Sequence, residues 1–251
     1  MNIGISRVSR NVYLPFSQTN GLLCHIVTVP VPLLRLFQGL ALILALTVPA
    51  IAEGTNSSLK PVGPGLFELG KVRLDKNNRT VSFPAVLNLS PGLIEYVVVT
   101  ETGKIHESLF RTEAEPFQIH TAMLLLGAKG AGTNRFPEQA NQPLPGNKVT
   151  IEVTWRMEGG ARQNRRAEEL VYNQQTKSTM SRGPWIYNGS RMFDGTFVAQ
   201  QDGSIVSLIE DPDALINNPR LGRESDEIWE VKTNGLPPLN SPVEIKIKVG
   251  Q

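Results

Sequence analysis

Two histidines are the residues best able to carry chemistry in this sequence. His106 lies in ETGKIHESLF at 101–110, and His120 lies in the segment that follows. A neutral imidazole can bind a metal ion or transfer a proton near neutral pH. Glu101 and Glu115 would add carboxylates close to them in the chain. These four residues form the candidate metal site.

The period of a β-strand limits how such a site could be built. Successive side chains face opposite sides of a strand, so His106 and Glu107 cannot face one ion unless a bulge intervenes. Two histidines also fall short of the three or four ligands of a zinc site, and there is no HExxH pattern. Structural hydrogen bonding by both histidines is therefore favoured. No cofactor is expected, and a divalent metal stays an open alternative.

Three other segments resemble known ligand sites without matching them. The glycine-rich stretch 127–133 follows a predicted helix and lacks the GK[ST] ending of a phosphate loop. Ser190 lacks the GxSxG elbow of serine hydrolases. Asp211-Pro212-Asp213 offers oxygen ligands for calcium, but its spacing is not that of an EF-hand loop. None of the three predicts a catalytic residue.

Aromatic side chains and polar loops are candidates for binding. Trp155, Trp185 and Trp229 could line a sugar- or peptide-binding surface, because aromatic rings supply large, stiff contact areas. Trp155 continues an apolar strand face, which favours core packing instead. The segments 127–145 and 158–166 are polar and rich in Gly, Pro or Arg, so we expect exposed loops that could carry recognition.

Alternating apolar residues predict the strands that position these candidates. The clearest runs cover 81–89, 149–157 and 243–249, although Pro84 argues for an edge position or a bulge in the first. Two hairpins are also expected. One runs from 94–100 through Thr102-Gly103 to 104–110, and the other runs from 196–200 through Asp202-Gly203 to 205–209.

Helix signals are few. Thr112 and Glu115 fit a capping box and Gly127 fits a C-terminal stop, which predicts a helix at about 113–126. Its apolar face comprises Ile119, Ala122, Met123 and Leu126. A one-turn helix is expected at about 212–217, with Asp211 as its cap. Many strands with one proper helix predict an α+β fold built on a mainly antiparallel sheet.

The first 52 residues differ in composition from the rest. They hold no Asp or Glu, and the apolar run LFQGLALILAL at 36–46 precedes Ala50-Ile51-Ala52. This pattern predicts a secretory signal peptide at 1–52 that is cleaved before Glu53, and it favours a periplasmic or extracellular location. The alternative is an N-terminal membrane anchor, but prolines and Arg35 interrupt the apolar stretch.

Cleavage would leave a cysteine-free, nearly neutral chain. Three of the 25 basic residues and Cys24 lie in 1–52, so 22 basic and 23 acidic residues would remain, a net charge near −1. Without a basic stripe, nucleic acid is not an expected partner. The remainder is predicted to form a flexible leader at 53–64 and one domain at 65–251, with no membrane span after cleavage.

Four blocks of sequence carry a family resemblance. They are ETGKIHESLF at 101–110, EPFQIHTAMLLLGA at 115–128, WIYNGSRMF at 185–193 and DPDALINNP at 211–219. In this order they resemble the YdjY-domain family of exported bacterial proteins. The resemblance implies a single intact domain with the histidine-bearing segment as a recurring element, and it implies no mechanism.

These observations favour a non-enzymatic exported domain that binds a ligand or a partner in the cell envelope. The motivation is the lack of catalytic motifs beside long polar loops on a β scaffold. One alternative is a metal-dependent enzyme or metal carrier that uses His106 and His120. The other is a structural envelope component that self-associates through an exposed strand edge, for which the strand at 243–249 is one candidate.

Overall fold

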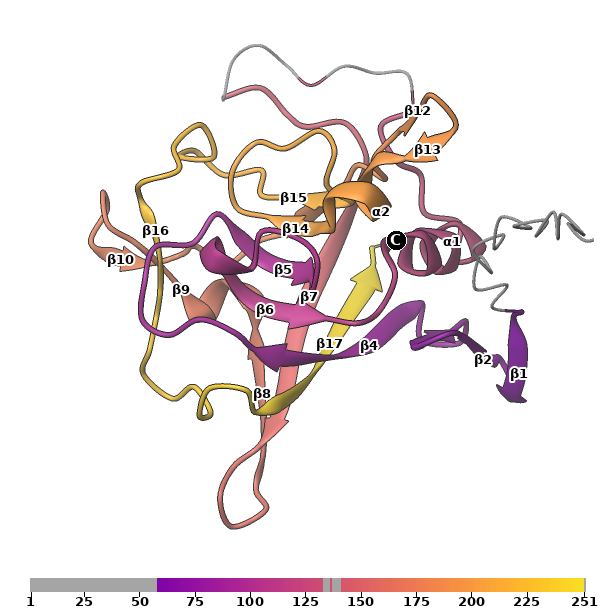
Figure 1. Ribbon diagram of the computed structural model, residues 1–251, viewed down its shortest axis with the longest axis horizontal. Helices are drawn as coiled ribbons and strands as arrows, with labels where there is room; N and C mark the ends of the chain where they lie inside the picture. The colour runs from indigo at the N-terminus through magenta and orange to yellow at the C-terminus, as the bar shows by residue number, and fades with distance from the viewer. Residues whose placement is uncertain (1–57, 133–135, 137–140, 251) are drawn as a thin grey trace, which may run out of the picture. The chain divides into compact units, whose positions relative to one another are not determined.

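The computed structural model describes residues 58–132, 136 and 141–250, most of them in a β-rich fold (Figure 1). Its helices are α1 (Pro116–Leu125) and α2 (Val198–Asp202), with 3₁₀ turns η1 (Ile105–Glu107) and η2 (Ala167–Leu170). Its strands are β1 (Lys60–Gly63), β2 (Leu66–Leu69), β3 (Val72–Asp75), β4 (Thr80–Leu87), β5 (Tyr96–Thr100), β6 (Ser108–Thr112), β7 (Asn147–Arg156), β8 (Arg162–Arg166), β9 (Val171–Asn173), β10 (Ser178–Thr179), β11 (Trp185–Tyr187), β12 (Met192–Phe193), β13 (Thr196–Phe197), β14 (Ser204–Ser207), β15 (Ile216–Asn217), β16 (Trp229–Val231) and β17 (Pro242–Val249).

Eight strands close into a barrel. They follow the order β4-β17-β7-β11-β15-β14-β5-β6, and β6 pairs back with β4. Strands β1, β2 and β3 extend the sheet beyond β4, and β8 pairs with β7. A separate side sheet has the order β10-β9-β16. The predicted β-rich fold is confirmed, but the sheet is mixed, because β5–β6 and β14–β15 are parallel pairs.

The two clearest predicted strands lie side by side in the barrel. On β7 and β17, apolar residues alternate with more exposed polar ones, and Ile151 pairs with Ile247 in the buried interior. This alternation gives one face to the core and one to water. Strand β17 pairs with β4 on one side and β7 on the other. The predicted open edge at 243–249 is therefore wrong, and self-association through another strand edge stays a prediction.

Pro84 sits at a local edge inside an interior strand. On one side of β4, residues 80–82 pair with β3 and residues 86–87 pair with β6. Pro84 falls between these partners, where the missing proline N–H breaks no ladder bond. Its carbonyl accepts a hydrogen bond of 2.6 Å from Thr112 Oγ1 instead. The expectation of an edge position thus holds locally.

Both predicted hairpins are wrong. Strands β5 and β6 run parallel, joined through η1, and Asp202-Gly203 ends α2 instead of forming a two-residue turn. Gly203 has φ of 71°, which suits a helix C-terminus as well as a hairpin. The two turns meet each other, since Thr100 N donates to Gly203 O at 2.8 Å. A Cβ on Gly203 would lie 2.8 Å from Gly103 Cα, so this approach requires glycine.

Helix α1 matches the prediction, although it begins later than expected. The predicted apolar face, Ile119, Ala122, Met123 and Leu126, is buried. Gly127 N donates to Leu124 O, and Ala128 N donates to Met123 O, which together form a Schellman C-cap. Thr112 does not cap the helix, because its hydroxyl accepts from Ala114 N at the end of β6.

The predicted helix at 212–217 is wrong. Asp211 Oδ1 accepts from Asp213 N, and Asn217 Oδ1 accepts from Asp211 N, so side chains fold this segment into a turn that leads to β15. Aspartate and asparagine favour such local bonds over helical ones. Part of the predicted loop at 158–166 is also wrong, since Arg162–Arg166 forms β8 against β7.

The predicted leader, export segment and first loop have different outcomes. Lys60–Gly63 forms β1, where composition predicted a flexible leader. The export segment 1–52 and part of the loop 127–145 lie outside the described residues. Among the residues that are described, no helix is both long and apolar enough to cross a membrane.

Candidate functional site

His106 and Glu101 lie at the connection between β5 and β6. His106 belongs to η1, its side chain is 76% exposed, and its Nε2 lies 3.4 Å from Glu107 Oε2. Glu101 directly follows β5, and its Oε1 lies 3.8 Å from Arg111 Nε. His106 thus lies beside a carboxylate, and Glu101 lies beside a guanidinium.

His120 and Glu115 belong to α1. His120 Nδ1 and Tyr187 Oη are 2.8 Å apart, and the centre of the Phe197 ring lies 4.9 Å from the imidazole centre. Burial lowers the pKa of His120, which favours the neutral ring. Glu115 is the N-cap residue of α1 and accepts a 3.0 Å hydrogen bond from Gln118 Nε2.

The four predicted ligands thus divide between the β5–β6 connection and α1. Among residues 58–132, 136 and 141–250, no group of three or more His, Cys, Asp or Glu side chains is arranged to hold a metal ion. The metal site stays a prediction. The described contacts of His120, with Tyr187 and Phe197, are those of a packed and hydrogen-bonded histidine.

The tryptophans do not form an exposed aromatic surface. Trp155, Trp185 and Trp229 are all almost fully buried. Trp229 Nε1 donates to Gly222 O at 3.1 Å, and Trp155 packs inside the barrel with the neighbouring strands. Their main contribution is apolar area buried in the core.

A lysine–tyrosine–aspartate chain lines a pocket of about 270 Å³ beside β5 and β14. Lys104 Nζ donates to Tyr96 Oη at 3.2 Å, and Tyr96 Oη donates to Asp211 Oδ2 at 3.1 Å. Burial and the charge of Asp211 raise the pKa of Tyr96 to about 12, despite Lys104. The phenol therefore stays protonated near neutral pH and makes a poor general base.

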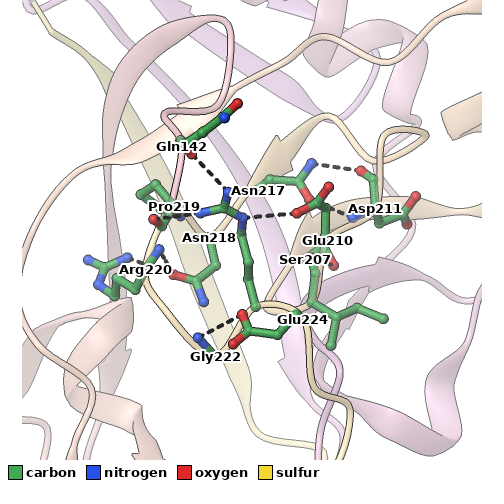
Figure 2. Close-up of polar contacts among 12 residues, drawn as sticks. Gln142, Ser207, Glu210, Asp211, Asn217, Asn218, Pro219, Arg220, Gly222 and Glu224 are labelled. Atoms are coloured by element: carbon green, nitrogen blue, oxygen red, sulfur yellow. Dashed lines mark hydrogen bonds and ion pairs between the residues drawn. The ribbon is translucent and has the colours of Figure 1, made fainter. Parts of the chain in front are cut away.

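Asp211 begins a buried polar network that runs through the DPDALINNP segment (Figure 2). Asn217 Nδ2 donates to Asp211 O at 2.7 Å and to Asn188 Oδ1 at 3.0 Å. Asn218 Nδ2 donates to Leu208 O at 3.0 Å. The side-chain oxygens and nitrogens of this segment are thus used to bond the chain to itself.

Arg223 is the charged centre of this network. Its side chain is 1% exposed, and its three nitrogens donate to Glu210 Oε2, Pro219 O and Gln142 O at 2.9–3.0 Å. The guanidinium therefore ties the segments 207–223 and 141–145 together. The three nitrogens of a guanidinium point at three separate acceptors, whereas the donors of a lysine all lie on one nitrogen.

A second arginine centre lies beside the first, around Glu168. Glu168 is fully buried, and its Oε1 accepts from Arg166 Nη2 at 2.8 Å, Arg220 Nη2 at 3.2 Å and Gly183 N at 3.1 Å. Glu168 Oε2, Arg166 Nε and Trp185 Nε1 are buried without a partner among the described residues. Buried waters ordinarily satisfy such atoms.

Arg220 connects this centre to a surface pocket of about 440 Å³, named here the side pocket. The guanidinium packs over Trp185, with Cζ 5.3 Å from the ring centre, and its Nε donates to Ser181 O at 2.7 Å. The pocket lies against the side sheet. Its lining residues are Asn173, Thr176, Ser178, Thr179, Met180, Ser181, Arg220, Leu221 and Trp229.

Comparison with known proteins identifies the family. The sequence profile of the YdjY domain matches residues 72–248, which include the barrel, the side sheet and the side pocket. The chain belongs to the YdjY-domain family. Searches of curated proteins and of solved structures found no match to this chain.

Sequence reasoning missed the side pocket of this YdjY domain. Glu168 lies in RRAEEL, just after the predicted loop at 158–166, and the structure buries it completely. Arg220 follows DPDALINNP, whose oxygens drew attention to cation binding instead. Its pairing with Glu168 spans 52 residues of chain, and local spacing carries no signal for such a contact.

Proposed function

We propose that this YdjY domain is an exported, non-enzymatic domain that binds a small ligand in its side pocket. The observation that carries the proposal is the construction of this pocket. One wall is an arginine fixed by a buried carboxylate and a tryptophan, and the other walls combine hydroxyl groups with apolar side chains. Fixed polar groups beside apolar walls are typical of ligand sites.

The tyrosine and lysine of the smaller pocket support binding over catalysis there. Tyr96 stays protonated, with a pKa of about 12, and its neighbour Lys104 also has a raised pKa. Burial opposes the charge of Lys104, but Tyr96, Glu107 and Glu95 together outweigh it. A catalytic acid or base works best with a pKa near the operating pH.

Export is the second part of the proposal, and it rests on the composition of residues 1–52. The test is to express the full chain in a bacterial host and to determine the N-terminus of the protein recovered from the periplasm. We expect a chain that begins at Glu53. Recovery of the intact chain from the cytoplasm would contradict export.

The binding proposal can be tested by filling the side pocket. Isothermal titration calorimetry of the protein recovered from the envelope would use glucose, glucuronate, N-acetylglucosamine, inorganic phosphate and sulfate as probes. Ser178 is exposed on β10 and lines the pocket, so Ser178→Trp should block it. Thr196→Trp, at an exposed strand position on β13, is the matched control.

We expect at least one probe to bind the wild type and the Thr196→Trp control, and to lose binding in Ser178→Trp. Equal binding by both variants would place the ligand elsewhere and overturn the assignment of the side pocket. Thermal unfolding of the same samples would show whether either tryptophan disturbs the fold.

A further inference from the structure

Arg220 has hydrogen-bonding capacity that its described neighbours do not use. A guanidinium carries five N–H groups. Three of them reach Ser181 O, Asn218 Oδ1 and Glu168 Oε1, at 2.7, 3.2 and 3.2 Å. The remaining two N–H groups have no acceptor among the described residues, and the side chain lines the side pocket. In Figure 2, Arg220 points away from the Glu210–Asp211 side of the polar network.

Arg220 belongs to a cluster of charged groups. Glu168 is shared by Arg166 and Arg220, so this buried centre holds two positive charges and one negative charge. Lys232 lies at the pocket wall, where its Nζ donates to Thr179 Oγ1 at 2.8 Å. Two carboxylates lie nearby and accept from neutral donors, Glu224 from Gly222 N and Glu230 from Gln174 Nε2. The attraction for an anion therefore comes from direct contact with Arg220, and not from an excess of positive charge around the pocket.

Other lining groups are also set to donate. Lys232 occupies a lone pair of Thr179 Oγ1, which leaves the hydroxyl proton free to donate. Asn173 Oδ1 accepts from Thr176 N at 2.9 Å, and the Asn173 amide NH₂ has no acceptor within the described part of the chain. Three donor groups from β9, β10 and the loop before β16 thus line one pocket.

The rest of the pocket wall is apolar. Met180, Leu221 and Trp229 contribute to it, and Leu221 is 69% exposed. A bare inorganic ion would leave this wall in contact with water. A ligand that joins an anionic group to a carbon skeleton would cover it and gain from burying apolar area.

From these contacts we infer that the side pocket binds a small organic oxyanion, a carboxylate or a phosphate or sulfate ester, with Arg220 as its charged contact. This inference rests on the proposed binding function and adds the class of ligand. Arginine forms strong, charge-assisted hydrogen bonds to such groups, and Nη1 and Nη2 of Arg220 each keep one N–H that no described residue accepts.

The test compares ligands that share a ring and differ in charge. Calorimetric titrations of the envelope-purified protein with glucuronate, glucose 6-phosphate and glucose separate a carboxylate, a phosphate ester and a neutral sugar. We expect at least one anion to bind about tenfold more tightly than glucose, which corresponds to about 1.4 kcal/mol. Its affinity should fall as sodium chloride is raised, because salt screens the charge.

Three variants assign the effect to Arg220. Arg220→Gln should remove the preference for the anion over glucose, and Arg220→Lys should weaken it, because an ammonium cannot bind both oxygens in one plane. Arg182→Gln is the matched control, since Arg182 is 71% exposed and pairs with Glu169 outside the pocket. It should retain wild-type affinity.

The outcomes separate the inference from the proposed function. If glucose binds as well as the anions and Ser178→Trp abolishes binding, the ligand class is wrong and the pocket still binds. If anions bind Arg220→Gln and the wild type equally, the inference is overturned. Because Arg220→Gln also removes a partner of Glu168, Thr179→Val provides an independent check. It should weaken anion binding without touching Glu168, and an unchanged affinity would contradict the donor arrangement.

Discussion

The barrel interior and the polar network around Arg223 are both buried, but different interactions hold them together. Inside the barrel, Ile151, Ile245 and Ile247 are fully inaccessible and touch other apolar side chains. In the network, Asn217 and Arg223 are as deeply buried and are held by hydrogen bonds to named oxygens. Apolar burial has no direction, whereas a hydrogen bond requires its own donor and acceptor.

This difference predicts different tolerance to substitution. A core of apolar residues accepts changes of similar volume at small cost. A buried polar group that loses its partner bears the full desolvation cost. The network should therefore respond to the identity of a side chain, and the barrel interior should respond to its size.

The largest effect is expected at Arg223. Arg223→Ala removes three hydrogen bonds and leaves Glu210, Pro219 O and Gln142 O without their donor. Removing one member of a buried ion pair costs about 3–5 kcal/mol, so the free energy of unfolding should fall by that amount in urea titrations. Hydrogen exchange should become fastest in 207–223, while β7 and β17 stay protected.

The matched control is Arg162→Ala. Arg162 pairs with Glu244 at 3.2 Å, but both side chains are largely exposed. Surface pairs contribute about 0–1 kcal/mol. A loss at Arg223 no larger than the loss at Arg162 would contradict the role given to the network, as would uniform loss of protection in the barrel.

A somewhat smaller effect is expected in the barrel. Ile151→Ala should lower the free energy of unfolding by about 2–5 kcal/mol, since it leaves a cavity between β7 and its neighbours. Ile151→Leu should cost less than about 1.5 kcal/mol. Thr150→Ala, on the outer face of the same strand, is the control for changes to the backbone. Equal losses for the leucine and alanine variants would show that this interior does not respond to side-chain size.

The same contrast explains which parts of the fold could be predicted from sequence. Strands β4, β7 and β17 repeat apolar residues with a period of two, and α1 carries an apolar face and a glycine stop, so local rules locate them. These rules do not specify strand partners. The run 94–110 fits a hairpin and a parallel pair equally well until η1 is seen to turn the chain.

The polar network could not be predicted, because its contacts join distant residues. The sequence predicts Asp211 as a helix cap. In the structure Asn217, six positions later, bonds to the backbone N–H and carbonyl of Asp211, and the chain turns into β15. Arg223 reaches Gln142 across 81 positions. Of the predicted site residues, His120 does lie in a hydrogen bond, but its partner Tyr187 is 67 positions away and was not foreseen.

Asn217 tests this directional bonding with a neutral side chain. Asn217→Leu keeps a similar volume but leaves Asp211 N–H and Asn188 Oδ1 without a partner, and it removes one of the two donors to Asp211 O, the other being Ala214 N. The expected loss in the free energy of unfolding is about 1–3 kcal/mol, the cost of unsatisfied buried polar groups. Asn164→Leu on the exposed strand β8 is the control and should change stability little. If Asn217→Leu left stability unchanged or raised it, the network would tolerate a substitution of similar volume as the barrel core does, and the contrast between the two regions would be wrong.

The smallest predicted effect is a pH dependence of stability that His120 causes. Burial lowers its pKa from the ordinary value of 6.5, so the unfolded chain takes up this proton more readily than the folded one. The contribution to stability is therefore complete above about pH 6.5 and is lost as pH falls toward the lower folded pKa. Asp202 and Glu95 oppose this trend at lower pH. Burial raises their pKa values, so the folded chain binds these protons more tightly than the unfolded chain, and their protonation stabilises the folded state. Urea titrations between about pH 5.5 and 7 should thus show a decline toward acid that disappears in His120→Gln. An unchanged slope in His120→Gln would contradict the assignment to this imidazole.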